Sequence, residues 1–189
     1  MAKKPKFIGI RRTTAFNGRR KIGIDTNIFV RIYDQPFLLR VEASRIFNRH
    51  DIIFTHAACL REFTKHIMLK KNCDFHSAKE EAKDFIKSRN VRIIYPTECF
   101  IPEEELKTFE KQSNEKLANM GKEYLHCHEP DSVIILVFKK CGVNKIYSTD
   151  EAARICASFL GMDSSNLPSF DNKIMRELRK DKKFYKQRR

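Results

Sequence analysis

Apolar residues along this chain follow two alternating patterns. Short runs rich in β-branched and aromatic residues, at 22–30, 51–54, 91–95 and 144–148, predict buried strands. Between these runs, apolar residues recur every three or four positions, which predicts amphipathic helices. The predicted helices cover residues 36–49, 55–71, 103–125, 131–140 and 151–159, and a further helix opens at Ser77.

The alternation of strands and helices through residues 22–160 predicts an α/β fold. We expect three layers, α/β/α, around a mostly parallel central sheet of about four to five strands. The run at 133–138 has the propensity of a strand, but its place just before another predicted strand favours a buried helix. We expect one domain at residues 22–165, preceded by a basic arm (1–21) and followed by a basic tail (166–189).

Composition is consistent with a single globular core. The chain has 189 residues, 41% of them hydrophobic, and no apolar run long enough to span a membrane. The basic N-terminus lacks the apolar segment of a secretory signal, so a cytoplasmic protein is expected. Its six cysteines are then expected to be reduced thiols.

The net charge of +14 is concentrated at the two ends of the chain. Residues 1–21 contain eight Lys and Arg and no acid, and residues 173–189 contain nine and two. The intervening residues hold 21 basic and 22 acidic side chains, so the body is near neutral. Such ends either solubilise the chain or contact a polyanion, and nucleic acid is the simplest polyanion. The candidate RNA-binding residues are Arg11, Arg12, Arg19, Arg20, Lys182, Lys183 and Lys186.

Four acids occur at the ends of predicted elements. Asp25 and Asp150 follow strands, Asp131 opens a helix, and Glu62 lies on the helix at 55–71. Singly, each has an ordinary explanation as a cap, a helix-dipole partner or a solvated residue. Together they are expected to converge at the carboxyl edge of the sheet. Clustered carboxylates repel one another, and Mg²⁺ or Mn²⁺ is the usual compensation.

The pattern resembles that of PIN-domain nucleases over roughly residues 21–160. The matching segments are Ile24-Asp25-Thr26-Asn27, Glu62, Pro130-Asp131 and Ser148-Thr149-Asp150. The resemblance implies a metal-dependent endoribonuclease, similar to VapC-type toxins and to RNA-processing PIN proteins. It implies that the four acids bind Mg²⁺ or Mn²⁺, with Thr26, Asn27 and Ser148 in support. It also implies RNA as substrate, an antitoxin or a ribosomal or RNP partner, and a homodimer by analogy.

Several alternatives remain open from the sequence. Glu129 and Glu151 are neighbouring acids that offer alternative metal ligands. His126 and His128 lie close to Asp131, either as RNA contacts or proton donors or as incidental loop residues. The chain is alternatively a non-catalytic RNA-binding or ribosome-assembly module on the same fold, or a structure-specific DNA nuclease. The long helix near 103–125 and the basic ends depart from a minimal PIN domain and leave the substrate open.

Overall fold

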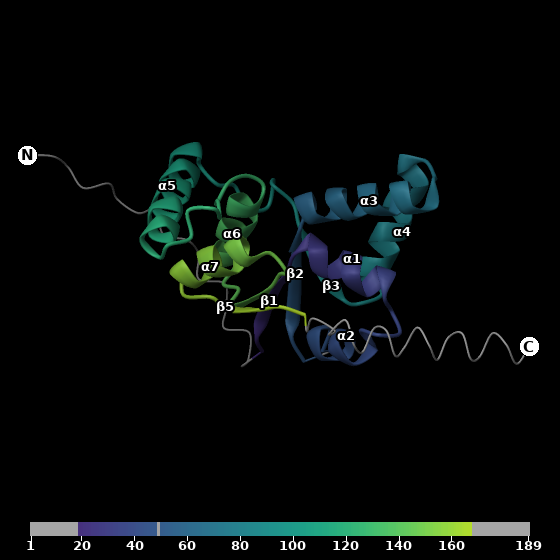
Figure 1. Ribbon diagram of the computed structural model, residues 1–189. Helices are drawn as coiled ribbons and strands as arrows, with labels where there is room; N and C mark the ends of the chain where they lie inside the picture. Colours follow the sequence, from purple (N-terminus) through teal and green to yellow (C-terminus); the bar gives the residue numbers. More distant parts are fainter. Residues whose placement is uncertain (1–18, 49, 168–189) are drawn as a thin grey trace, which may run out of the picture.

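The computed structural model describes residues 19–48 and 50–167, which form a central sheet between two layers of helices (Figure 1). The sheet contains β1 (Lys21–Ile24), β2 (Ile52–His56), β3 (Val91–Ile94), β4 (Lys145–Tyr147) and β5 (Asp163–Ser165). The helices are α1 (Thr26–Asp34), α2 (Arg40–Ile46), α3 (Ala57–Lys71), α4 (Phe75–Lys87), α5 (Glu103–Asn119), α6 (Asp131–Lys140) and α7 (Glu151–Phe159). The predicted α/β class is therefore confirmed.

The five strands lie in the order β3-β2-β1-β4-β5, and every neighbouring pair is parallel. The chain moves outward from β1 through β2 to β3, and then crosses to the other side of β1 to form β4 and β5. The direction of winding therefore reverses between β1 and β4. In open parallel sheets, a crevice at the carboxyl ends of such strands is the usual place for a functional site.

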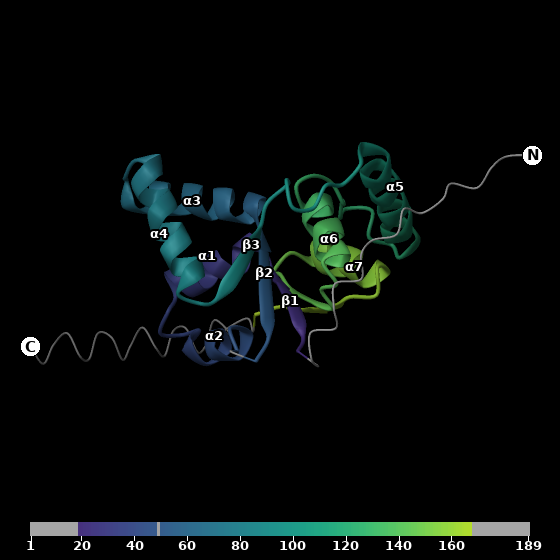
Figure 2. The same cartoon turned by 180° about the vertical axis from the view of Figure 1, so that it is seen from behind.

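Two apolar clusters, one on each face of the sheet, form the core. Neighbouring strand residues point to opposite faces, so Ile53 packs with α1, α3 and α4, whereas Phe54 packs with α5, α6 and α7. Figure 2 shows the same division from behind, with α3 and α4 on one side of the strands and α5, α6 and α7 on the other. The three layers predicted from the sequence are present.

A glycine on β1 lets α6 approach the sheet closely. A Cβ atom at Gly23 would lie 2.5 Å from the Cδ2 atom of Phe138, a fully buried ring on α6. Any larger residue would push the helix away from the strand or force the ring out of place. The close approach matters for the site because Asp131 is the first residue of α6.

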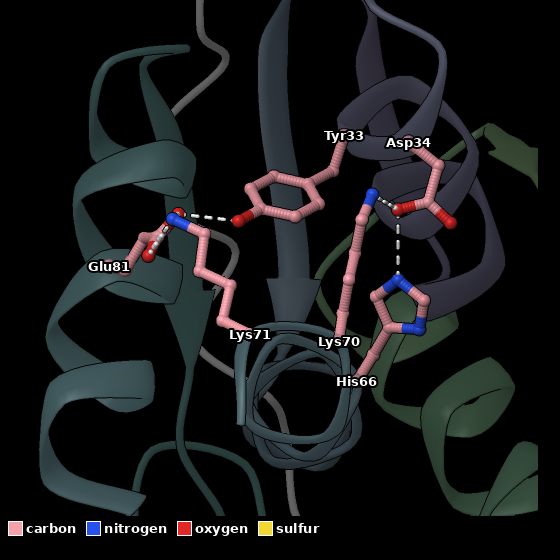
Figure 3. A network of polar contacts seen from close by, with 6 residues as sticks. All are labelled: Tyr33, Asp34, His66, Lys70, Lys71 and Glu81. Atoms are coloured by element: carbon pink, nitrogen blue, oxygen red, sulfur yellow. Dashed lines mark hydrogen bonds and ion pairs between the residues drawn. The ribbon is translucent and has the colours of Figure 1, made fainter. Parts of the chain in front are cut away.

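A polar network joins α1, α3 and α4 on the other side of the sheet (Figure 3). Its side chains are those of Tyr33, Asp34, His66, Lys70, Lys71 and Glu81. The Tyr33 hydroxyl donates to Glu81 Oε1 at 2.5 Å, and the Lys71 ammonium donates to both Glu81 oxygens at 2.7 Å. Burial would raise the pKa of Asp34, but hydrogen bonds from Lys70 and His66 outweigh it and lower the pKa. The network links α1 to both helices that pack beside it.

The structure corrects the prediction of a strand over residues 22–30. The strand ends at Ile24, and Thr26 begins α1. The chain turns there because the Asp25 carboxylate accepts a hydrogen bond from the Thr26 amide, as a helix cap does. The apolar residues at 28–30 are compatible with either element, so their composition alone does not place the boundary.

Other element ends also differ from prediction. Thr55, the first residue of the helix predicted over 55–71, belongs to β2 and donates through its hydroxyl to the Ile24 carbonyl, while His56 caps α3. The helix expected to open at Ser77 begins earlier, at Phe75, and Asp74 is its cap. The helix predicted to start at residue 36 begins at 40, and the one expected to reach 125 ends at 119. Strand β5 was not predicted, since its sequence Asp-Ser-Ser is polar.

The six cysteines are free thiols, as predicted, and three of them, Cys59, Cys127 and Cys156, are buried. Within the described residues, no helix combines the length and apolar character that crossing a membrane requires.

Candidate active site

Asp25, Glu62, Asp131 and Asp150 line one pocket of about 310 Å³. Asp25 links β1 to α1, Glu62 lies in the second turn of α3, Asp131 begins α6, and Asp150 caps α7. Asp25 directly follows β1, Asp150 follows β4 by three residues, and Asp131 begins α6. The structure therefore brings together the four acids that the sequence predicted to converge.

Asp25 is held by three donors. Its Oδ1 atom accepts from the Thr26 amide at 2.6 Å, and its Oδ2 atom accepts from the Ser148 hydroxyl at 2.6 Å and from the Asn27 side-chain amide at 2.7 Å. The side chain is only 6% exposed. A buried carboxylate requires such donors, because leaving it without them would carry a large desolvation cost. Asp25 is thus fixed in one orientation.

Asn27 and Ser148 also tie the ends of β1 and β4 together. Asn27 Oδ1 accepts from the Thr149 amide at 2.8 Å, and the Asn27 side-chain amide reaches the Ser148 hydroxyl oxygen at 3.2 Å. The same hydroxyl oxygen accepts from the Asp150 amide at 3.0 Å. Residues from two strand ends therefore hold Asp25 and Asp150 in a fixed relation.

Thr26 connects Asp25 to the third acid. Its hydroxyl donates to Glu62 Oε2 at 2.6 Å, while its amide binds Asp25. Asp150 is oriented separately, because its Oδ1 atom accepts from the Ala153 amide at 2.8 Å and caps α7. The cap role that the sequence offered as an alternative for Asp150 is real, and it coexists with a place in the pocket.

The setting of Asp131 and Asp25 disfavours the charged forms of these two acids. Burial raises the pKa of Asp131 to about 6, and the charges of Asp25, Asp150 and Glu62 add to the rise, while that of His128 opposes it. Burial also raises the pKa of Asp25, and the hydrogen bonds from Ser148 and Thr26 only partly offset this rise. The pocket is therefore an anionic site in which a positive ion would be stabilised.

The chemistry of the donors fits a divalent cation. Carboxylate oxygens are the ligands that Mg²⁺ and Mn²⁺ prefer. In Glu62 and in Asp150, one of the two carboxylate oxygens accepts a hydrogen bond from a protein donor. As the side chains of the described residues stand, no three His, Cys, Asp or Glu are arranged to hold a metal ion. Gathering such a ligand set therefore requires side-chain rearrangement within the pocket.

The pocket also contains two residues that the sequence analysis missed, Val30 and Arg31. Both lie on α1, and with Asn27 they recur at the i, i+3 and i+4 spacing of one helix face. Treating residues 22–30 as a strand concealed this face. The signal that could have revealed it is the cap sequence Asp-Thr-Asn followed by helical spacing.

Cys59 lies beneath the acids. Its Sγ atom is 4.0 Å from Asp25 Oδ1, and the side chain is fully buried on α3. Burial raises the pKa of the Cys59 thiol to about 12, and the neighbouring charge of Asp25 adds to this rise. The thiol is therefore protonated at neutral pH and acts as a packing residue.

The alternative acids and histidines lie outside this pocket. Glu151 pairs with Lys122, and Glu129 lines a different pocket. His126 and His128 are exposed, and His128 reaches the site through its charge near Asp131. None of these four residues lines the pocket of the four acids.

The predicted RNA-binding residues are described only in part. Arg11, Arg12, Lys182, Lys183 and Lys186 lie outside the described residues. Arg19 is exposed, and Arg20 donates two hydrogen bonds, of 3.0 and 3.1 Å, to the buried carboxylate of Asp51. Arg20 precedes β1 and therefore lies at the amino edge of the sheet, opposite the acid pocket.

Comparisons with known proteins support the fold. No protein-family model matches the chain, and no curated protein matches it. Among solved structures, a chain of VapBC-1 from nontypeable Haemophilus influenzae has a TM-score of 0.51 at 10% identity, over 77% of this chain and 97% of that one. A chain of VapBC2 from Rickettsia felis, bound to a DNA fragment from their promoter, has a TM-score of 0.50 at 13% identity, over 77% and 98%.

At these identities the likeness is one of fold. The chain has a PIN-like fold, which is the fold that the resemblance in the sequence implied.

Proposed function

We propose that this PIN-like chain is a divalent-metal-dependent endoribonuclease that hydrolyses RNA phosphodiester bonds. The observation that carries the proposal is the convergence of Asp25, Glu62, Asp131 and Asp150, from four separate elements, on one pocket. The likeness to VapBC chains supports a nuclease of this kind. An antitoxin-like protein partner and a homodimer are part of the same proposal.

The four acids would hold Mg²⁺ or Mn²⁺. When bound, such an ion supplies positive charge to the phosphate and lowers the pKa of a water molecule. Asp25 contributes a carboxylate fixed by three donors, so it needs little reorganisation. Arg31 also lines this pocket, and its positive charge would favour a phosphate there.

The test is cleavage of single-stranded RNA by the full chain with Mg²⁺ or Mn²⁺. Asp25→Asn and Asp131→Asn are each expected to lower kcat by at least about a hundredfold, the scale of losing one electrostatic group at a reacting phosphate. Glu151→Gln is the matched control, because it removes an acid next to Asp150 that pairs with Lys122 outside the pocket. Undiminished cleavage in both aspartate variants would identify a contaminant and reject the proposal.

Two further measurements separate the alternatives. Calorimetry that detects tight RNA binding but no Mn²⁺ binding would favour a non-catalytic RNA-binding or ribosome-assembly module. Preferential cleavage of flap DNA over single-stranded RNA would favour a structure-specific DNA nuclease.

A further inference from the structure

A second pocket, of about 450 Å³, is lined in part by residues near the start of α6, two positions before and two positions after Asp131. It is lined by His56 at the end of β2, by the loop that follows β3, and by residues on either side of Asp131. Glu129 and Val133 line this second pocket, whereas Asp131 between them lines the first. The chain around the start of α6 therefore contributes to both pockets.

His56, one of the residues that line this pocket, has a buried hydrogen-bond donor without a partner among the described residues. The residue is 4% exposed, and its Nδ1 atom accepts from the Ala58 amide at 3.3 Å as the cap of α3. Burial lowers the pKa of His56, so the ring is neutral and carries its proton on Nε2. Nε2 has no hydrogen-bond partner among the described residues. A buried donor of this kind is explained by a ligand that supplies an acceptor.

The remaining walls combine apolar surface with negative charge. Phe100 is 76% exposed, and Ile101, Leu106 and Val133 add further apolar surface. The carboxylates of Glu103 and Glu129 also line the pocket. Two carboxylates beside a neutral imidazole would repel an anion, so binding of a phosphate or a carboxylate in this pocket is disfavoured. A neutral, planar ring that offers both donors and acceptors fits this environment.

The loop that presents Phe100 is anchored to α6. The Lys140 ammonium donates to the Phe100 carbonyl at 3.4 Å and to Glu105 Oε2 at 2.7 Å. The exposed ring is therefore attached to the helix that carries Asp131. Exposed aromatic rings on such supports are the usual stacking partners of unpaired bases.

We infer that this second pocket binds an unpaired nucleobase of the RNA, next to the phosphate at the acids. The base stacks on Phe100, accepts from His56 Nε2 and donates to a carboxylate. This inference rests on the proposed endoribonuclease activity, and it adds that the enzyme selects single-stranded positions through one base beside the cleaved bond.

The experiment uses single-stranded RNA decamers in which one nucleotide at a time is replaced by an abasic ribose. Binding is measured by fluorescence anisotropy in EDTA, and cleavage is measured separately with Mn²⁺. For the unmodified chain, one abasic position beside the cleaved bond is expected to weaken binding about tenfold, which is the scale of one base–aromatic stack.

Phe100→Ala is expected to weaken binding of the intact RNA by the same factor. In this variant, the abasic replacement at that position should cause no further loss of binding. Phe37→Ala is the matched control, since this ring is 88% exposed and lines neither pocket. His56→Asn retains a good capping residue, and its shorter side chain withdraws the donor from the position of Nε2, so it is expected to reduce discrimination between bases at that position.

The two proposals fail in different ways. Absence of metal-dependent cleavage would reject the endoribonuclease, while the binding series in EDTA would still measure base recognition. Equal binding of every RNA by Phe100→Ala and Phe37→Ala would overturn the base pocket even if cleavage were normal. A Phe100→Ala defect that is the same for intact and abasic RNA would overturn it as well.

Discussion

At the scale of single residues, the sequence predicts which acids meet but not how they are held. Asp25, Glu62, Asp131 and Asp150 follow from element ends, because parallel strands bring such ends to one edge. The Thr26 hydroxyl donates to Glu62, which lies 36 residues further along the chain, and this hydrogen bond depends on the packing of α1 against α3. The sequence contains no local signal of that contact.

Asp131 should make stability depend on pH. Its pKa is raised to about 6, so the folded chain binds this proton more tightly than the unfolded chain, whose carboxyl has a pKa near 3.8. Stability is therefore lost as pH rises from about 4 through 6. In EDTA at pH 7, Asp131→Asn is expected to increase the free energy of unfolding by on the order of 1–2 kcal/mol. Urea denaturation between pH 4 and pH 7 measures the difference, which should vanish at pH 4.

Glu151→Gln is the control for Asp131→Asn, because it makes the same carboxylate-to-amide change at an exposed ion pair and should shift stability little at any pH. Mn²⁺ should stabilise the unmodified chain more than Asp131→Asn. A gain at pH 7 that is equally large at pH 4 would contradict the assigned cause.

Asp150 has two roles that substitution can separate. Asn caps a helix about as well as Asp, so Asp150→Asn should keep the bond to the Ala153 amide and lose only the charge. Asp150→Ala should lose both, with an additional loss of about 1 kcal/mol of stability. Both variants are expected to cleave RNA poorly, whereas thermal unfolding should distinguish them. Equal stability of the two variants would show that the cap contributes nothing.

At the scale of elements, periodicity predicts the layers better than the boundaries. The helix at 131–140 is correctly predicted although its residues favour a strand, because its place between two other elements decides the assignment. Residues 26–30 were assigned to the wrong element, because Asp25 both follows the strand and caps the helix, so no loop separates the two elements. Strand β5 is defined by pairing with β4, and its own polar residues do not indicate it.

The polar network between α1, α3 and α4 gives a prediction for element packing. Tyr33→Phe keeps the ring that packs edge-on against Phe63 and Phe85, and removes the hydroxyl that donates to Glu81. The expected loss is about 1 kcal/mol of unfolding free energy, the value of one such hydrogen bond. Urea denaturation measures it, with Tyr124→Phe at a 69% exposed position as the control. Losses of equal size in both variants would argue against the network.

At the scale of the whole molecule, charge and chemistry occupy different parts of the chain. The body is near neutral and presents an anionic pocket, while the excess of Lys and Arg lies in residues 1–21 and 173–189. Arg20, at the amino edge of the sheet, is separated from Asp25 by the length of β1, roughly 13 Å at 3.3 Å per residue. Attraction of RNA and its cleavage should therefore be separable.

Replacing Lys182, Lys183 and Lys186 together by Gln tests that separation. If each lysine contacts one phosphate, the salt dependence of RNA binding should flatten by about 2 in the log–log slope. Cleavage at saturating RNA should change little. The control replaces Lys107, Lys111 and Lys116 on α5, which removes the same charge from the body. An equal change of slope in both triple variants would assign the effect to net charge alone.

The thiol beneath the acids gives the site a chemical reporter of its own motion. Cys59 is inaccessible while α3 and β1 stay packed, so an alkylating reagent should reach it only when this edge of the sheet opens. We expect maleimide to label the partly exposed Cys73, Cys99 and Cys141 first, with Cys59 following at the opening rate. Mass spectrometry of the peptides would then show whether Mn²⁺ or RNA slows the opening of this edge of the sheet. The measurement requires no substitution of a residue that lines the pocket.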